Sequence, residues 1–187
     1  MTRVVVGISG ASGSAYGLRL IERLRARPDV ETHLVLSRPG EKTMFHETGR
    51  TAADLKRLVS HWHPIDAIGA PIASGSYPID AMVIAPCSVH TMSAIATGIA
   101  SNLLVRAADV TLKERRPLIL LVRETPLHLG HLRTMVSLAE MGAIIAPPLP
   151  AFYTKPETVE DIVDQSVNRV LDLLRLPAED TKRWQGL

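Results

Sequence analysis

The sequence predicts a single α/β domain built on a doubly wound parallel sheet. Three features lead to this prediction. Short apolar runs recur along the chain, segments with helical spacing separate most of them, and glycine or hydroxyl residues follow several of the runs. Since strands buried on both faces of a parallel sheet read as unbroken apolar runs, this alternation is typical of a sheet with helices on both faces.

The first strand and helix are the clearest elements. Residues 4–8 form a β-branched run, a glycine-rich turn follows, and residues 16–24 place Leu18, Ile21 and Leu24 at helical spacing. Further strands are predicted at 32–37, 81–85, 118–122 and 143–146. Right-handed crossovers would bring the loops after these strands to one edge of the sheet, in a Rossmann-like or flavodoxin-like arrangement.

The last helix is predicted from about residue 159 to 175. Apolar side chains at 162, 163, 167, 170, 171 and 174 form one stripe, which leaves Arg169 near the opposite side. Prolines at 147, 148 and 150 indicate a stiff connector before this helix. Residues 1–187 are expected to form one domain with a C-terminal tail from about residue 177. A surface helix end or loop is expected at His61, Trp62 and His63.

Composition limits the function classes. The chain has 187 residues, 46% hydrophobic and 21% charged, which suits one compact domain. The net charge of +2 with scattered basic residues does not indicate a nucleic-acid partner. We expect no signal peptide, no membrane span and a cytoplasmic location. A single cysteine, Cys87, leaves no internal disulfide.

Arg123 and Glu124 directly follow the unbroken apolar run 118–122. The carboxyl end of a buried parallel strand opens onto the ligand crevice of an α/β sheet. Neighbouring strand residues point to opposite faces, so these two charges are not expected to satisfy each other. A functional role is favoured over a structural ion pair, because charges are costly to bury without partners.

Three other strand ends carry small polar residues. Gly7-Ile-Ser-Gly-Ala-Ser-Gly13 is a turn whose amides can approach an anion, although it lacks the dinucleotide spacing and the P-loop lysine. Ser37 ends the second strand, and 86–91 opens a further helix with two hydroxyls. Helix capping explains each residue singly. Together they favour a phosphate and isoalloxazine cradle.

A charged segment at 98–116 places Arg106, Asp109, Lys113 and Arg116 at helical spacing. Taken alone, this pattern favours a surface charge ladder over a binding face, so the segment by itself decides nothing about function. The pairs His61/His63 and His128/His131 lack accompanying ligands at metal spacing, and no metal site is predicted. Cys87 has no clear base beside it and is expected to be a packed residue.

Six motifs then occur in order along the chain. They are Gly-Ile-Ser-Gly-Ala-Ser-Gly at 7–13, Ala-Ser-Gly-Ser at 73–76, Pro-Cys-Ser at 86–88, Arg-Ala-Ala-Asp-Val-x-Leu-Lys-Glu-Arg-Arg at 106–116, Arg-Glu-Thr-Pro-Leu at 123–127 and Pro-Pro-x-Pro-Ala-Phe-Tyr at 147–153. With 161–169 and Arg-Trp-Gln-Gly at 183–186, the chain resembles the UbiX-type flavin prenyltransferases over nearly its whole length.

The resemblance implies transfer of a dimethylallyl group from dimethylallyl monophosphate to reduced FMN, first at N5 and then by ring closure at C6. The prenylated FMN would serve a UbiD-type decarboxylase. By similarity, the FMN-binding residues are Gly10, Ala11, Ser12, Ser37, Ser88, Val89, His90, Thr91 and Arg123. The prenyl phosphate would be held by Lys113, Tyr153 and Arg169, with Ser74 and Arg106 near the reacting centre.

The resemblance further implies catalytic roles for Glu47, Glu124 and Ser12, together with Arg106 and Lys113. Glu47 and Glu124 would handle protons, without an assignment of which does which. A lysine, an arginine and a tyrosine hydroxyl can stabilise a leaving phosphate without a metal ion. The family is dodecameric, which implies a homo-oligomer with sites completed between protomers.

One departure and two alternatives stand beside this interpretation. Residues 67–71 lack the tryptophan that some members carry there, so cation–π stabilisation from that position is in doubt, and Trp62 is a poor substitute. An FMN-dependent oxidative decarboxylase of the cysteine type would typically show Pro-Ala-Ser-Ala-Asn-Thr, where this chain has 86–91. A non-catalytic flavin carrier or decarboxylase subunit would need no second phosphate site.

Overall fold

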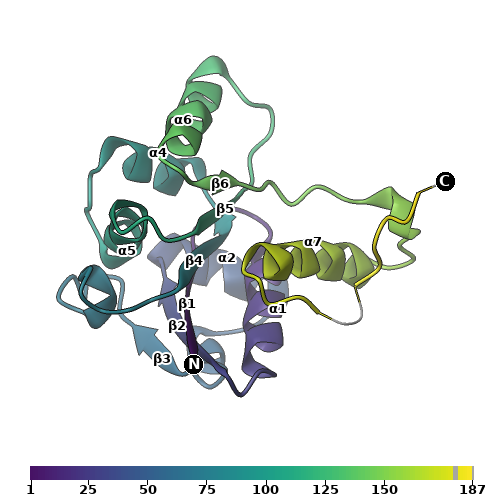
Figure 1. The fold of residues 1–187 in the computed structure, drawn as a ribbon, viewed down its shortest axis with the longest axis horizontal. Helices are drawn as coiled ribbons and strands as arrows, with labels where there is room; N and C mark the ends of the chain where they lie inside the picture. Colours follow the sequence, from purple (N-terminus) through teal and green to yellow (C-terminus); the bar gives the residue numbers. More distant parts are fainter. Residues whose placement is uncertain (179–180, 187) are drawn as a thin grey trace.

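The computed structural model describes residues 1–178 and 181–186, which contain one six-stranded parallel sheet (Figure 1). The strands are β1 (Thr2–Ile8), β2 (Val30–Leu36), β3 (His61–His63), β4 (Ala81–Cys87), β5 (Leu118–Val122) and β6 (Ile144–Ile145), in the order β3-β2-β1-β4-β5-β6. This is the Rossmann order, and without the short edge strand β3 the remaining five follow the flavodoxin order. The predicted doubly wound sheet is therefore confirmed.

Helices cover both faces of the sheet. On one face, α1 (Ser14–Arg25), α2 (Arg38–Thr48), α3 (Ala52–Lys56) and α7 (Val159–Leu173) share a core. On the other face, a second core is shared by α4 (Val89–Thr97), α5 (Leu103–Lys113) and α6 (Leu129–Glu140). Two short 3-10 helices, η1 (Pro71–Ala73) and η2 (Phe152–Thr154), lie in the connections. Consequently α5 and α7 lie on opposite sides of the sheet (Figure 1).

The central strands explain the apolar runs in the sequence. Val4 and Val6 of β1 belong to the core under α1 and α7, whereas Val5 belongs to the core under α4 and α5, and all three are fully buried. Because both faces of the strand are covered, neither can carry polar residues. Among the described helices, none is both long and apolar enough to span a membrane.

One expected element is wrong. Residues His61, Trp62 and His63 form the edge strand β3, paired in parallel with β2, and not a surface helix end or loop. A strand of three mostly polar residues has no periodicity of its own, so its conformation depends on pairing with β2. The last helix ends at Leu173, slightly before the predicted end. Residues 179–180 and 187 of the predicted tail lie outside the described residues.

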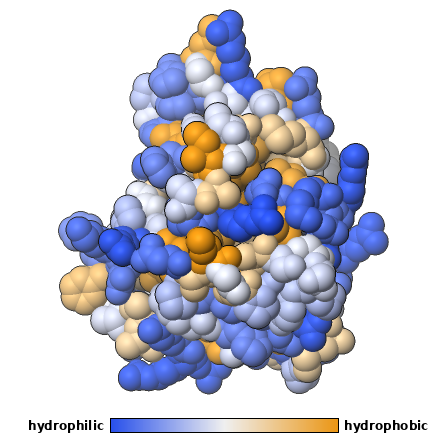
Figure 2. All heavy atoms as spheres, turned by 90° about the vertical axis from the view of Figure 1, so that its left-hand side faces the viewer, coloured by the Kyte–Doolittle hydropathy of each residue, from blue (hydrophilic) through white to orange (hydrophobic). Residues whose placement is uncertain are grey.

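Apolar side chains reach the surface on the side of α4, α5 and α6. Figure 2, which faces this side, shows several hydrophobic patches between hydrophilic side chains. On α6, Leu129, Leu132 and Val136 are 59%, 45% and 57% exposed. An exposed apolar helix face of this kind is a candidate for contacts with another protein surface.

Candidate active site

A cavity of about 420 Å³ opens at the carboxyl edge of the sheet. The strand order reverses between β1 and β4, and the crevice at such a point is the usual ligand site of open α/β sheets. The cavity is large enough for a cofactor-sized molecule. Its lining residues are Gly10, Ser37, Arg38, Pro39, Ile65, Asp66, Ser88, His90, Thr91, Ser101, Asn102 and Leu104.

Three helices begin at this cavity. Ser37 caps α2 by accepting from the Gly40 amide at 3.0 Å, and Ser88 caps α4 by accepting from the Thr91 amide at 3.3 Å. Asn102 caps α5 by accepting from the Val105 amide at 3.0 Å. Capping is therefore the correct local explanation for these side chains. Because the three N-termini converge, they also make the cavity favourable for an anion.

Ser9 fixes the two strand ends that frame the cavity. Its hydroxyl donates to the Pro86 carbonyl at 2.9 Å and accepts from the Ser88 amide at 2.7 Å. Next to it, a Cβ atom on Gly10 would lie 2.5 Å from Cβ of Pro39, so only glycine allows the first turn to approach α2 this closely. Sequence reasoning missed both Ser9 and Asn102. For Asn102 the signal was its position just before a helical run.

The amides that begin α1 are bound by a carboxylate of the same chain. Glu47 accepts from the Gly13 amide at 3.0 Å and from the Ser14 amide at 2.8 Å, and it also hydrogen-bonds to the Ser12 side chain. The sequence analysis expected the amides of this turn to approach an anion, and for Gly13 and Ser14 that anion is the carboxylate of Glu47.

The same contacts set the charge of Glu47. Burial raises the pKa of its carboxyl group, but the hydrogen bonds from Ser12, Ser14 and Gly13 outweigh this and hold the pKa below its ordinary value. Glu47 is consequently ionised at neutral pH. Ser12, beside it, is exposed, and its hydroxyl donates a hydrogen bond to this carboxylate.

The remaining FMN-binding candidates lie around the same edge. Ala11 is buried in the first turn, and Val89 is the first residue of α4. The Arg123 amide donates to the Cys87 carbonyl at 3.1 Å, which ties the end of β5 to the end of β4 and leaves the Arg123 side chain exposed. Half-buried Glu124 accepts from the Thr125 amide at 3.0 Å. Both charged residues thus follow β5 at the predicted edge.

Tyr153 and Arg169 lie together in a second cavity of about 170 Å³. Leu121 and Ala146, at the carboxyl ends of β5 and β6, form part of its wall. The Tyr153 hydroxyl accepts from Nε2 of Gln165 at 3.1 Å, and Nη1 of Arg169 lies 3.6 Å from Oδ2 of Asp172. This cavity brings together two of the three predicted phosphate-binding residues.

Lys113 lies in a different part of the structure. It ends α5 shortly before β5 begins, and it lines a cavity with Glu140 and Met141, the end of α6. It forms an ion pair with Glu114 close to Gly75. Since α5 begins at Leu103, just after its cap Asn102 on the carboxyl edge, and extends about 16 Å, Lys113 lies toward the amino edge. A single chain therefore does not form the predicted grip of Lys113, Tyr153 and Arg169.

Arg106 is on α5 with Lys113, and Ser74 directly follows η1, which packs against α5. Nε of Arg106 donates to the Ala73 carbonyl at 3.2 Å, and Nη1 of Arg106 pairs with Asp109 at 2.7 Å. The Ser74 hydroxyl lies 2.9 Å from that of Ser76. Within one chain the Arg106–Asp109 pair is the surface charge ladder that the spacing allowed. These three residues form a group on the α5 side of the sheet.

Cys87 is a packed residue, as predicted. Its side chain is fully buried, and burial raises the pKa of the thiol to about 12. A thiol that stays protonated in an apolar environment is not an activated nucleophile.

Comparisons with known proteins agree with this geometry. Residues 1–171 match a family model described as Flavoprotein. The flavin prenyltransferase UbiX of Thauera aromatica is 53% identical over 98% of this chain and 94% of its own length.

Two solved structures are similar over nearly the whole chain. A dodecameric FMN-dependent UbiX-like decarboxylase from Escherichia coli O157:H7 matches with a TM-score of 0.97 and 45% identity, covering 99% of this chain and 100% of its own. AnUbiX (PadA1) in complex with FMN and dimethylallyl pyrophosphate also matches with a TM-score of 0.97 and 45% identity, and the match covers 100% of this chain and 98% of AnUbiX.

Proposed function

The chain belongs to the flavoprotein family and, within it, to the UbiX flavin prenyltransferases, and from this membership we propose that it transfers a dimethylallyl group from dimethylallyl monophosphate to reduced FMN. The observation that carries the proposal is the cavity at the switch point of the sheet, where three helix N-termini meet. The sequence identity of this chain to a flavin prenyltransferase extends over almost its full length, and this favours neither an oxidative decarboxylase nor a flavin carrier.

The cavity suits FMN in both shape and chemistry. Ile65 and Leu104 offer an apolar wall for a ring system, and the first turns of α2, α4 and α5 offer amides for a phosphate. When bound, reduced FMN supplies the nucleophilic ring atoms N5 and C6. The residues that would hold it are Gly10, Ala11, Ser12, Ser37, Ser88, Val89, His90, Thr91 and Arg123.

Tyr153, Arg169 and Lys113 would stabilise the phosphate that leaves the dimethylallyl group. An allylic carbon–oxygen bond breaks more easily when cationic and hydroxyl donors bind the departing oxygens, and such donors act without a metal ion. Ser74 and Arg106 would complete the polar wall near the reacting carbon.

We assign the proton steps from the contacts of the two carboxylates. Glu47 is held ionised by the amides of Gly13 and Ser14, so it would accept the proton that leaves the flavin ring, directly or through Ser12. Glu124, which follows the end of β5, would donate a proton to the leaving phosphate.

The active site would be completed by a second protomer. Lys113 lies toward the amino edge of the sheet at the end of α5, whereas Arg169 lines the cavity at the carboxyl ends of β5 and β6 on the other face. One phosphate would therefore meet both residues where two chains adjoin. The exposed apolar side chains of α6 provide a surface for such contacts. We therefore propose a dodecamer like the E. coli relative, a cytoplasmic location, and transfer of the product to a UbiD-type decarboxylase.

Anaerobic incubation with reduced FMN and dimethylallyl monophosphate, followed by mass spectrometry of the released flavin, tests the proposal. The expected result is a flavin heavier by one prenyl group, absent when the phosphate donor is omitted. A parallel incubation with dimethylallyl pyrophosphate compares the two donors. If both ligands bind but the flavin stays unmodified, the transferase activity is refuted. The flavin carrier and the oxidative decarboxylase would then be the functions to test.

A further inference from the structure

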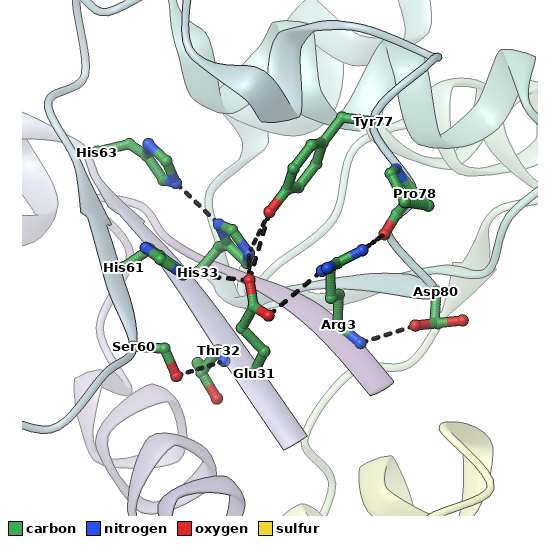
Figure 3. Close-up of polar contacts among 10 residues, drawn as sticks. All are labelled: Arg3, Glu31, Thr32, His33, Ser60, His61, His63, Tyr77, Pro78 and Asp80. Carbon is green, nitrogen blue, oxygen red and sulfur yellow. Dashed lines mark hydrogen bonds and ion pairs between the residues drawn. The ribbon is translucent and has the colours of Figure 1, made fainter. Parts of the chain in front are cut away.

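A cluster of three histidines and one glutamate lies where β2 pairs with β3 (Figure 3). Glu31 and His33 are two residues apart on β2, so their side chains share one face of the sheet. His61 of β3 is aligned with His33 in the strand register. As a result, Nε2 of His33 and Nε2 of His61 lie 3.0 and 3.1 Å from the same atom, Oε1 of Glu31.

These atoms are arranged as ligands of a transition metal ion. Two imidazole nitrogens and one carboxylate oxygen are donors that Zn²⁺, Co²⁺ and Ni²⁺ accept. With metal–ligand bonds of about 2.0 to 2.2 Å, tetrahedral ligand atoms lie about 3.3 Å apart. The three donor atoms here all lie within 4.8 Å of one another. Small side-chain rotations would therefore open the cluster to an ion.

Neighbouring residues orient the donor atoms from outside. Nδ1 of His33 lies 2.9 Å from Nε2 of His63, so His63 can accept the Nδ1 proton and leave Nε2 of His33 free to bind an ion. Nε of Arg3 donates to Oε2 of Glu31 at 3.3 Å, which leaves Oε1 facing the imidazoles. Such second contacts fix the tautomer and the direction of metal ligands.

The burial of the cluster suits a bound ion with access from one side. The side chains of His33 and Glu31 are 2% and 14% exposed, whereas that of His61 is 50% exposed. The cluster is therefore enclosed by protein around His33 and Glu31 and open to solvent at His61.

Hydrogen bonds alone can also satisfy the cluster, because each imidazole can donate its Nε2 proton to Glu31. A metal ion would bind Nε2 of each neutral imidazole, whose single ring proton would then lie on Nδ1, where that of His33 can be donated to His63. Tyr77 contributes the remaining polar group, with its hydroxyl 3.3 Å from Oε1 of Glu31 and 3.4 Å from Nε2 of His33. Adding metal to the protein therefore distinguishes the hydrogen-bonded cluster from a metal-binding one.

We propose that Glu31, His33 and His61 form a binding site for a divalent transition metal ion such as Zn²⁺, with a fourth position open to water or to Tyr77. The site is separate from the carboxyl-edge cavity, which no member of the cluster lines. It would join the three-residue strand β3 to the sheet and so fix the start of the chain segment that brings Ile65 and Asp66 to the cavity. Its role is structural, and it does not depend on the proposed transferase activity.

The test is titration of metal-stripped, full-length protein with Co²⁺, followed by visible absorption, and with Zn²⁺, followed by calorimetry. We expect one ion per chain, the absorption of four-coordinate cobalt and a higher Tm with Zn²⁺. His61→Gln should weaken binding at least tenfold, because His61 supplies one of three protein ligands. Glu31→Gln should do the same through a different residue.

His128→Asn is the matched control. His128 and His131 form another stacked pair in the described chain, with ring centroids 3.5 Å apart, and asparagine can keep the N-cap of α6 that His128 now provides. This variant should bind metal like the wild type. Circular dichroism and Tm in metal-free buffer verify that the variants are folded. Absence of binding in the wild type, unchanged binding in both folded cluster variants, or loss of binding in His128→Asn would overturn the proposal.

Discussion

The separation of Lys113 from Arg169 makes a sharp prediction about mixed assemblies. Either substitution alone, Lys113→Ala or Arg169→Ala, should lower turnover about 10²-fold or more, because each removes a cationic donor from the leaving phosphate. The two residues lie on helices that cover opposite faces of the sheet, and Lys113 is at the far end of α5 from the cavity at the carboxyl edge. A phosphate site that uses both must therefore take them from two chains.

The expected recovery follows from random assortment. In an assembly of equal numbers of the two variants, a site needs its lysine from an Arg169→Ala chain and its arginine from a Lys113→Ala chain. Each condition is met in half of the cases, so roughly a quarter of the sites regain both residues. If one chain supplied both residues, every site would keep one substitution and no activity would return.

Co-expression of the two variants with different affinity tags, followed by purification over both tags, yields the mixed assemblies, and prenylated FMN formation measures their activity. Tyr153→Ala with Arg169→Ala is the matched control, because these two residues line one cavity of one chain. That mixture should stay as inactive as its parents. The reasoning is refuted if the Lys113 and Arg169 variants fail to complement, or if the control pair does.

Three further predictions concern single residues. Glu124→Gln should lower turnover about 10²- to 10⁴-fold with unchanged FMN affinity, and joint loss of flavin and activity contradicts the proton-donor role. Glu47→Gln should lower the free energy of unfolding by about 1 kcal/mol at pH 7, after allowance for solvent screening. Because hydrogen bonds hold the folded-state pKa of Glu47 below its ordinary value, this difference should shrink when urea denaturation is repeated at pH values falling through that pKa. A difference that does not depend on pH would contradict this reasoning. Ser88→Ala should remove the cap of α4, lower stability by about 1 kcal/mol and lower Tm by about 2 to 4 °C, and an unchanged Tm in thermal denaturation would show that the cap contributes nothing.

Local pattern accounts for what the sequence predicted well. The run 118–122 is apolar throughout because both faces of β5 are covered, and β5 has these bounds. Ser37 and Ser88 precede helices because their hydroxyls cap the first turn. Strand ends of a parallel sheet share one edge, so the gathering of small polar residues there followed from the alternation of elements alone.

Tertiary structure decided the contacts between residues distant in sequence. Glu47 reaches the amides of Gly13 and Ser14 because α2 packs beside the start of α1, and no spacing along the chain encodes that distance. The cluster of Glu31, His33 and His61 exists only because β3 pairs with β2, and its ligands have no recognisable spacing as a linear motif.

The sequence by itself thus determined the α/β class, the buried strands and the edge at which ligands bind, since these depend on periodicity and on the handedness of crossovers. Only the tertiary structure decided that Glu47 fills the first amide site, that β3 brings four titratable groups together, and that Lys113 and Arg169 are apart. The physical reason is that burial pattern records which face of an element is covered, but not which distant residue covers it.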